Sequence, residues 1–228
     1  MSGAKLSRPG STQSGRGSGS DIHVSLKENE FFKSADEVLL KSKGKTAGDG
    51  PIRLLEDILF LDISQQQLID ISQVSLCLRL KICIFHSNFV ANLEPLSNAP
   101  SLKIIDASSN RIKHIPGELF WSGFTYLEVL YLHDNPIANL ECLGMLTGAP
   151  KLRIVTLYDT PLSLNNNYRH VAVNSMWHLE GIDFYLISDE EIIQVSWPSV
   201  VNDNLFQLHI MPSKHVGELL VAISLFMT

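Results

Sequence analysis

Apolar residues in the middle of the chain recur in a rhythm that fits neither a helix nor a strand alone. In LEVLYLHDNPIANL, which begins at Leu127, they are spaced by three, two, five and three residues. The central LYL alternates as a half-buried strand does. Asn135 and Pro136 then end the strand, because proline cannot donate to a ladder and asparagine readily completes a turn. The pattern predicts a short strand followed by a sharp turn.

The same pattern occurs five times along the chain. It has the form apolar-x-x-apolar-x-apolar-x-x-Asn-x-apolar and starts at Ile58, Leu80, Leu102, Leu127 and Leu152, so the periods are 22, 22, 25 and 25 residues. In the first and last units Gln66 and Thr160 replace the asparagine. Between strands the apolar residues lie three apart, which predicts a 3₁₀ or helical return. The two longer units leave room for a full helical turn in GELFWSGFT and in 141–149.

One such unit is unstable by itself. It buries about eight apolar side chains at ~2 kcal/mol each, whereas ordering it costs roughly 1.5 kcal/mol per residue. Stacking buries both faces of each unit, so we expect a solenoid in which every unit contacts the next. Asn88, Asn110 and Asn135 then form a column that can bond backbone groups of adjacent turns, which makes these asparagines structural.

The open ends of a solenoid need covering. Residues 160–187 are strongly apolar without a regular period and are expected to cap the C-terminal end. Their candidate buried side chains are Tyr168, Val171, Val173, Met176, Trp177, Leu179 and Ile182. Ser188 and Glu191 form a capping box, which predicts a helix that ends before Pro198.

A second capping box, Ser25 with Glu28, predicts a helix from about Lys27 to Lys43 at the other end. The side chains expected to face the first repeat are Phe31, Phe32, Ala35, Val38 and Leu39.

The expected organisation has four parts. Residues 1–24 form a disordered Gly/Ser-rich tail, 25–50 a short helix and linker, 51–187 the five repeats with their cap, and 188–228 a capping helix and a tail of uncertain structure. In that tail, Val216 to Met227 has apolar residues at helical spacing. This segment can fold back on the cap, pair with a partner helix or lie exposed.

Composition and charge narrow the class of protein. The chain has 228 residues, 45% of them hydrophobic, and a net charge of −6, and residues 51–228 are the acidic part. An acidic folded surface disfavours nucleic-acid binding, and no apolar run is long enough to cross a bilayer. Cys77, Cys83 and Cys142 lack metal-ligand spacing and, without a secretory signal, are expected to be reduced thiols of a cytoplasmic, intracellular protein.

With the repeats in place, the sequence resembles the intracellular leucine-rich repeat proteins of the 22-residue class, and NNNYRHVAV with LEGID resembles their C-terminal cap. The runs FWSGFTYLEVLYLHDNPIANLECL and YRHVAVNSMW with ISDEEII resemble more narrowly the leucine-rich repeat proteins that also carry IQ motifs. The resemblance implies an α/β solenoid with a concave parallel sheet and a 3₁₀ or helical convex side. It also implies a non-enzymatic interaction scaffold, several relatives acting in cilia and flagella. The calmodulin-binding pattern IQxxxRGxxxR is absent, so calmodulin binding is not carried over.

The candidate partner-binding surface is the concave face, where the third, fifth and seventh positions of each repeat point out of the sheet. Its candidate residues are Ile82, Ile84, His86, Ile104, Asp106, Ser108, Val129, Tyr131, His133, Ile154, Thr156 and Tyr158. The first repeat adds Phe60, Asp62 and Ser64 to the same columns. The five third positions form an apolar stripe. These side chains either support one another across neighbouring strands or form a groove for a partner protein.

Several catalytic and ligand-binding interpretations fail. His133 and Asp134 are adjacent, so they point to opposite sides of a strand. His86 lies two repeats from His133, about 9 to 10 Å away, too far for a shared metal ion. KGKTAGDG, from Lys43, lacks the earlier glycine of a phosphate loop. No cofactor and no metal are expected, and Trp121 is expected to pack in the core.

The sequence therefore predicts a non-enzymatic intracellular scaffold that binds a protein partner, with the ciliary or flagellar axoneme implied by the resemblance. The alternative is a regulatory or targeting subunit that docks an enzyme such as a protein phosphatase.

Overall fold

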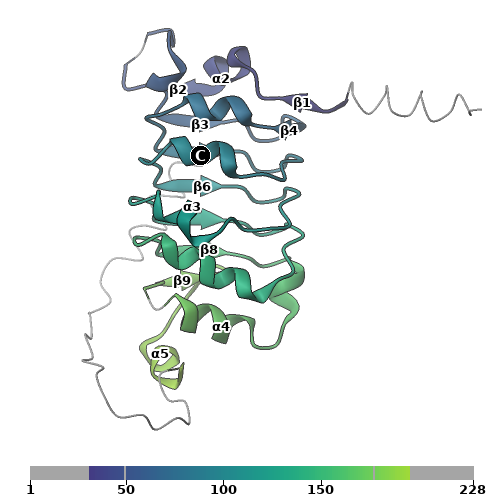
Figure 1. Ribbon diagram of the computed structural model, residues 1–228, viewed down its shortest axis with the longest axis vertical. Helices are drawn as coiled ribbons and strands as arrows, with labels where there is room; N and C mark the ends of the chain where they lie inside the picture. The colour runs from purple at the N-terminus through teal and green to yellow at the C-terminus, as the bar shows by residue number, and fades with distance from the viewer. Residues whose placement is uncertain (1–30, 49, 177, 196–228) are drawn as a thin grey trace, which may run out of the picture.

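The structure is a computed structural model, and it describes residues 31–48, 50–176 and 178–195. The tail at 1–24, Trp177 and the apolar segment 216–227 lie outside the described residues. Figure 1 shows the repeats stacked one above the next. One end of the stack carries β2 (Gly44–Lys45) and α2 (Glu37–Lys43), and the other carries α4 (Tyr168–Ser175) and α5 (Asp189–Val195).

Each of the five repeats contributes one strand to a single sheet. The strands are β3 (Phe60–Asp62), β5 (Ile82–Ile84), β6 (Ile104–Asp106), β7 (Val129–Tyr131) and β8 (Ile154–Thr156), all parallel to their neighbours. The sheet order is β10-β9-β8-β7-β6-β5-β3-β2. The chain advances one strand per repeat, as the periods predict. β2 (Gly44–Lys45) and β10 (Tyr185–Leu186) close the two ends by antiparallel pairing, and β9 (Gly181–Ile182) continues the parallel part.

The register of the sheet confirms the predicted alignment of the repeats. One column of paired residues runs through the interior, and each of its side chains is fully buried. Its members are Leu61, Cys83, Ile105, Leu130 and Val155. Cys77 and Cys142 are also buried free thiols, and burial raises the pKa of both to about 11, so they stay protonated and pack as small apolar groups.

The asparagine column is structural, as predicted. The side-chain amide of Asn88 donates to the carbonyl oxygens of Ile63 and Phe85 at 2.9 and 2.8 Å, and its oxygen accepts from the Leu68 N–H at 3.0 Å. Asn110 and Asn135 repeat this arrangement and are buried as well. Each asparagine thus satisfies backbone groups of its own turn and of the preceding one.

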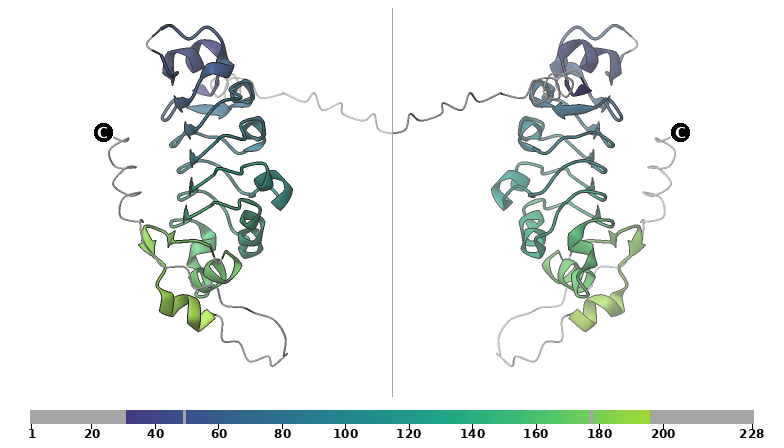
Figure 2. Two further views of the ribbon diagram at one scale, coloured as in Figure 1. Left: turned by 90° about the vertical axis from the view of Figure 1, so that its left-hand side faces the viewer. Right: turned by 90° about the vertical axis from the view of Figure 1, so that its right-hand side faces the viewer.

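The returns lie on the opposite side from the sheet (Figure 2). Most are 3₁₀ helices: η1 (Leu55–Asp57), η2 (Ser72–Leu76), η3 (Glu94–Asn98), η4 (Leu140–Gly148) and η5 (Pro161–Leu164). The third repeat returns through the α-helix α3 (Glu118–Ser122). Trp121 on α3 is fully buried and its indole N–H donates to the Pro116 carbonyl at 3.0 Å, so its predicted place in the core is confirmed. The extra residues of the longer units form α3 and the nine-residue η4.

The predicted continuous N-terminal helix is wrong in its described part. Residues Lys33–Ser34 form strand β1, which pairs in parallel with β4 (Leu68–Asp70), and the helix α2 is confined to Glu37–Lys43. The edge of β4 offers free carbonyl groups, and Lys33 and Ala35 donate backbone N–H bonds to Gln67 and Asp70 at 3.0 and 2.8 Å. These bonds hold the chain extended until Asp36 caps α2 by accepting from the Leu39 N–H at 2.8 Å.

The later start of the helix also changes which of its side chains face the first repeat. Val38 is 76% exposed, while Leu40, which was not among the expected contacts, is fully buried. Ala35 is buried and Leu39 partly so, as expected. Phe31 is 48% exposed and packs with Phe32 against Phe89 of the second repeat.

The C-terminal cap contains α4 (Tyr168–Ser175) and α5 (Asp189–Val195) around the β9–β10 hairpin. The Ser188 hydroxyl accepts from the Glu191 N–H at 3.2 Å, which confirms the predicted cap of α5. The Glu191 carboxylate accepts from Nε and Nη2 of Arg169 on α4, at 2.6 and 3.0 Å, and so ties the two helices together.

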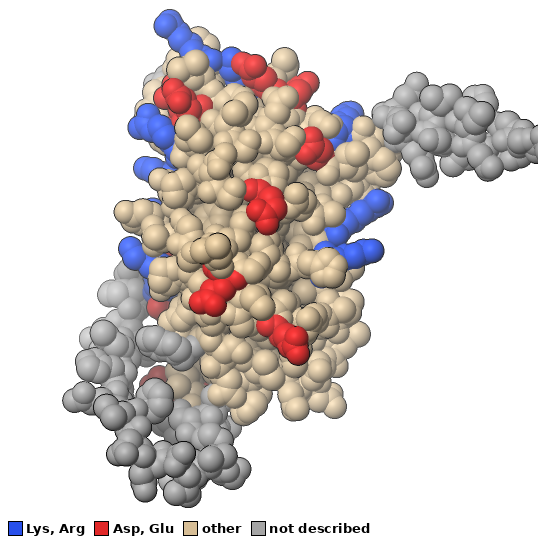
Figure 3. Space-filling model, viewed as in Figure 1, with Lys and Arg blue, Asp and Glu red and all other residues tan. Residues whose placement is uncertain are grey.

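The side of the solenoid that carries the returns has a simple charge pattern. Acidic residues stand in the first turns of the returns, at Glu56, Asp57, Glu94, Glu118 and Glu141. Figure 3 shows Asp and Glu side chains down the middle of this face, with Lys and Arg along its two flanks. No helix within the described ranges is both long and apolar enough to span a membrane.

Candidate functional site

The face of the sheet turned away from the returns carries the candidate residues. In β3 and β5 the central residue is buried and its two neighbours are partly exposed, because successive side chains in a strand point to opposite sides. Phe60, Ile82, Ile84 and Ile104 therefore form an open apolar strip on this face. His86 lies beside the strip, partly exposed, with Nδ1 3.0 Å from the Ser87 hydroxyl.

The same columns are closed in the later repeats. The buried members are Asp106, Ser108, Val129, Tyr131, Ile154 and Thr156, while His133 and Tyr158 are partly exposed. The expected apolar stripe along all five repeats is thus interrupted, because Val129 and Ile154 are 1% and 2% exposed. Val129, Tyr131 and Ile154 pack together as a small second core, with Ile104 at its margin. The side chains of the stripe thus support one another in the fourth and fifth repeats and stay partly exposed in the first three, where a groove for a partner protein stays a prediction.

Two carboxylates on this face are held by local hydrogen bonds. Asp106 accepts from the backbone N–H and the hydroxyl of Ser108, at 3.1 and 2.6 Å. Asp62 and Ser64 form the same pair in the first repeat, at 3.0 and 2.6 Å. These contacts fix the loop that follows each strand, which is a structural use of the aspartate.

An aromatic cluster covers the closed part of the face, and we define it as Tyr131, His133, Tyr158 and Phe184. His133 stacks on Tyr158 with ring centroids 4.3 Å apart and planes 12° from parallel. Phe184 lies 5.9 Å from Tyr131 and 5.8 Å from Tyr158. His133 Nδ1 is also 2.8 Å from the buried Thr156 hydroxyl. The cluster joins the fourth repeat, the fifth repeat and the cap.

Burial sets the ionisation of the cluster. It lowers the pKa of His133, and this effect exceeds the opposing influence of the Asp106, Asp134, Asp159 and Asp183 carboxylates. His133 is therefore mainly neutral near pH 7. Burial raises the pKa of Tyr131 to about 12.

Phe184 was not among the sequence-derived candidates. It sits with Asp183 in the two-residue turn between β9 and β10, where both residues have positive φ, 64° and 53°. Two positive φ values define the type I′ hairpin turn, for which Asn-Gly or Asp-Gly is the recognisable sequence. Phenylalanine in the second position gives no such sequence signal. The Asp183 carboxylate accepts from the N–H groups of Leu157 and Tyr158, at 2.6 and 3.0 Å, and so holds the turn against the fifth repeat.

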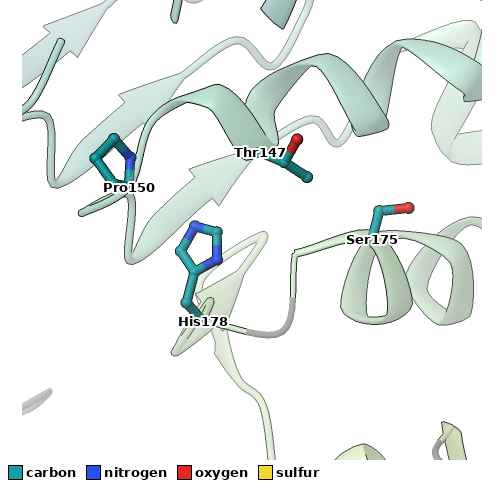
Figure 4. A pocket seen from close by; sticks show the side chains of 4 residues that line it. All are labelled: Thr147, Pro150, Ser175 and His178. Carbon is teal, nitrogen blue, oxygen red and sulfur yellow. The ribbon is translucent and has the colours of Figure 1, made fainter. Parts of the chain in front are cut away.

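A separate hollow of about 260 Å³ lies between η4 and the cap, lined by Thr147, Pro150, Ser175 and His178 (Figure 4). Burial lowers the pKa of His178. The lining offers no paired acid and base and shares no residue with the aromatic cluster. Within the described part of the chain, no group of three or more His, Cys, Asp or Glu side chains is arranged to hold a metal ion.

The comparisons with known proteins agree with the repeat architecture. The chain is 40% identical over 139 residues to leucine-rich repeat and IQ domain-containing protein 3 of Homo sapiens, a match that covers 61% of this chain and 22% of that protein. It is 32% identical over 104 residues to leucine-rich repeat-containing protein 23 of Bos taurus, covering 46% and 30%. It is 34% identical over 89 residues to leucine-rich repeat-containing protein 51 of the same species, covering 39% and 45%. The chain thus spans about a fifth of the length of the first of these relatives.

Among solved structures, a chain of the Drosophila melanogaster SNF/U2A' complex shares the fold, with a TM-score of 0.54 and 20% identity. That match covers 72% of this chain and 91% of the other. No family model matches the chain. The parallel register of five repeats, the buried asparagine column and these relatives lead to one conclusion: the chain has the α/β solenoid fold of leucine-rich repeat proteins.

Proposed function

We propose that this chain is a non-enzymatic protein-interaction module that binds a partner protein on the sheet face of its solenoid. The observation that carries the proposal is the open apolar strip of Phe60, Ile82, Ile84 and Ile104. Apolar side chains left partly exposed side by side are typical of surfaces that another protein covers. The strip lies on a rigid sheet whose register is fixed by the buried interior column, so its shape is set before a partner arrives.

Two further features support a binding role over catalysis. The histidines of this face have structural neighbours: His86 contacts Ser87, and His133 contacts Thr156 and Tyr158. The buried thiols are held protonated and lie away from solvent. The known leucine-rich repeat relatives are consistent with such a module. An intracellular, axonemal setting remains a prediction that proximity labelling in ciliated cells tests.

A matched pair of variants tests the use of the strip. Ile84→Asp places a charge in the middle of the strip, whereas Leu119→Asp places one on α3, on the opposite side of the solenoid, where the side chain is 88% exposed. We expect affinity capture from ciliated cells to lose its main partner with Ile84→Asp and to retain it with Leu119→Asp. Thermal denaturation of both variants checks that the fold is intact.

If well-folded Ile84→Asp captures the same partner in the same amount, the proposal is wrong. The nature of the captured protein decides between roles: a cytoskeletal assembly supports a scaffold, whereas a stoichiometric enzyme such as a phosphatase supports a regulatory subunit.

A further inference from the structure

The hairpin turn of the cap places an aromatic ring on the sheet face at the expense of an unfavourable backbone conformation. Phe184 has φ of 64°, a region that glycine adopts freely and that bulky residues avoid. The residue is nevertheless 53% exposed. It lies against Tyr131 and Tyr158 on one side and leaves the other side open to solvent. Burial of this side chain therefore does not account for a phenylalanine at this position.

The surroundings of the ring are acidic and lack their own cation. Asp134 and Asp159 are exposed and lie close enough for their charges to act on His133 and Tyr158, and Asp183 is partly exposed in the turn itself. None of the three takes part in a salt bridge among the described residues. Residues 127–195 contain nine Asp or Glu against three Lys or Arg, so this end of the molecule is negatively charged.

Each of those three basic residues is engaged elsewhere. Arg153 binds Glu180 through two nitrogens, both at 2.6 Å. Arg169 binds Glu191, and Lys151 lies over the Tyr126 ring, 4.9 Å from its centroid. The Asp134 and Asp159 carboxylates thus keep their charge available to a group from outside the chain, whereas one oxygen of Asp183 is already held by two backbone N–H groups.

An aromatic face ringed by carboxylates favours one kind of side chain. A guanidinium or ammonium group over a ring is attracted by the ring quadrupole, and nearby carboxylates add charge-assisted hydrogen bonds. An aliphatic side chain would gain nothing from the carboxylates. We propose that Tyr158 and Phe184, together with Asp134, Asp159 and Asp183, bind an arginine or lysine side chain of the partner protein. This inference rests on the proposed function, since it names the chemistry of the partner that the sheet face receives.

The proposal is tested with the full chain and a short blocked peptide of alternating glycine and arginine. The control peptide carries citrulline in place of arginine, which keeps the shape and removes the charge. We expect the arginine peptide to bind, with NMR shifts at Tyr158 and Phe184, and its affinity to fall as salt is raised. We expect the citrulline peptide to cause no such shifts.

Variants of the cap locate the site. Phe184→Gly removes the ring and suits the positive φ, so the turn is retained, and it should weaken arginine-peptide binding by roughly twofold to fivefold. Asp159→Asn should weaken it as well. Tyr185→Ala is the matched control, because Tyr185 is the next residue, is 72% exposed and lies outside the cluster, and it should leave binding unchanged.

Equal binding of the two peptides, or unchanged binding by Phe184→Gly, overturns the inference. Failure here is distinct from failure of the proposed function. If Ile84→Asp abolishes capture of the cellular partner while the arginine peptide does not bind, only the cationic site is wrong. If the arginine peptide binds through Phe184 while Ile84→Asp captures the cellular partner as the wild type does, the proposed function is wrong. The cationic site is then supported as a property of the cap.

Discussion

At the scale of single residues, the buried asparagine amides join each repeat to the next. Asn110 donates to the carbonyl oxygens of Phe85, Ala107 and Ser108, at 3.1, 3.2 and 3.0 Å. Its oxygen accepts from the Val90 N–H at 3.0 Å. No apolar side chain can replace these bonds, and a buried backbone group left without a partner costs about 1–3 kcal/mol.

Asn110→Ala should therefore lower the free energy of unfolding by about 1–3 kcal/mol, because the Val90 N–H loses its partner and the Phe85 and Ala107 carbonyls each lose one of two donors. Asn98→Ala is the control, since this exposed asparagine makes one 3.4 Å bond to the Ser75 carbonyl. It should change the stability by less than about 0.5 kcal/mol. Urea denaturation compares the two variants, and equal effects would contradict a structural role for the column.

At the scale of elements, close packing of the returns depends on a glycine. Gly148 ends η4, where a Cβ atom would collide with the carbonyl oxygen of Glu118 on α3. Gly144 lies in the same 3₁₀ helix, and a Cβ atom there would meet open space. The returns of the longer third and fourth units can lie close together because the residue of η4 that faces α3 is a glycine and has no Cβ atom.

Gly148→Ala should lower the free energy of unfolding by about 1–3 kcal/mol, because α3 and η4 must move apart. Gly144→Ala should leave stability unchanged or raise it by up to about 1 kcal/mol, since alanine restricts the unfolded chain. Thermal unfolding of the two variants measures the difference. A similar melting temperature for both would show that the contact between the two returns is not tight.

At the scale of the whole molecule, histidines near the C-terminal end link stability to pH. Burial lowers the pKa of both His133 and His178 below the ordinary value of 6.5. The unfolded chain therefore binds protons at these residues at a higher pH than the folded chain does. Folding stability contributed by the neutral imidazoles is present above about pH 6.5 and is lost as the pH falls below it.

The melting temperature should accordingly decrease between pH 7.5 and pH 5.5, above the range in which most carboxylates titrate. His133→Gln keeps a polar group opposite the Thr156 hydroxyl and removes the titration, so its melting temperature should vary less over this interval. His114→Gln serves as the control, because the His114 side chain is exposed to solvent. A His133→Gln profile parallel to the wild-type profile would contradict the assignment.

The sequence by itself determined the repeats, their register and their interior, because an apolar pattern that recurs every 22 or 25 residues has one arrangement that buries every copy against the next. Leu61, Leu130 and the asparagine column are therefore found where the pattern places them. The start of α5 could also be predicted from the sequence, because Ser188 and Glu191 have the three-residue spacing of a capping box.

Only the tertiary structure decided how much of the sheet face stays open. The strand β1 forms because the edge of β4, more than thirty residues later in the sequence, offers hydrogen bonds. A helical pattern in residues 27–43 carries no information about that edge. Phe184 reaches Tyr131 because a turn with two positive φ values directs its ring across two repeats. Both outcomes depend on contacts between residues far apart in sequence, whereas periodicity records only which side of an element is buried.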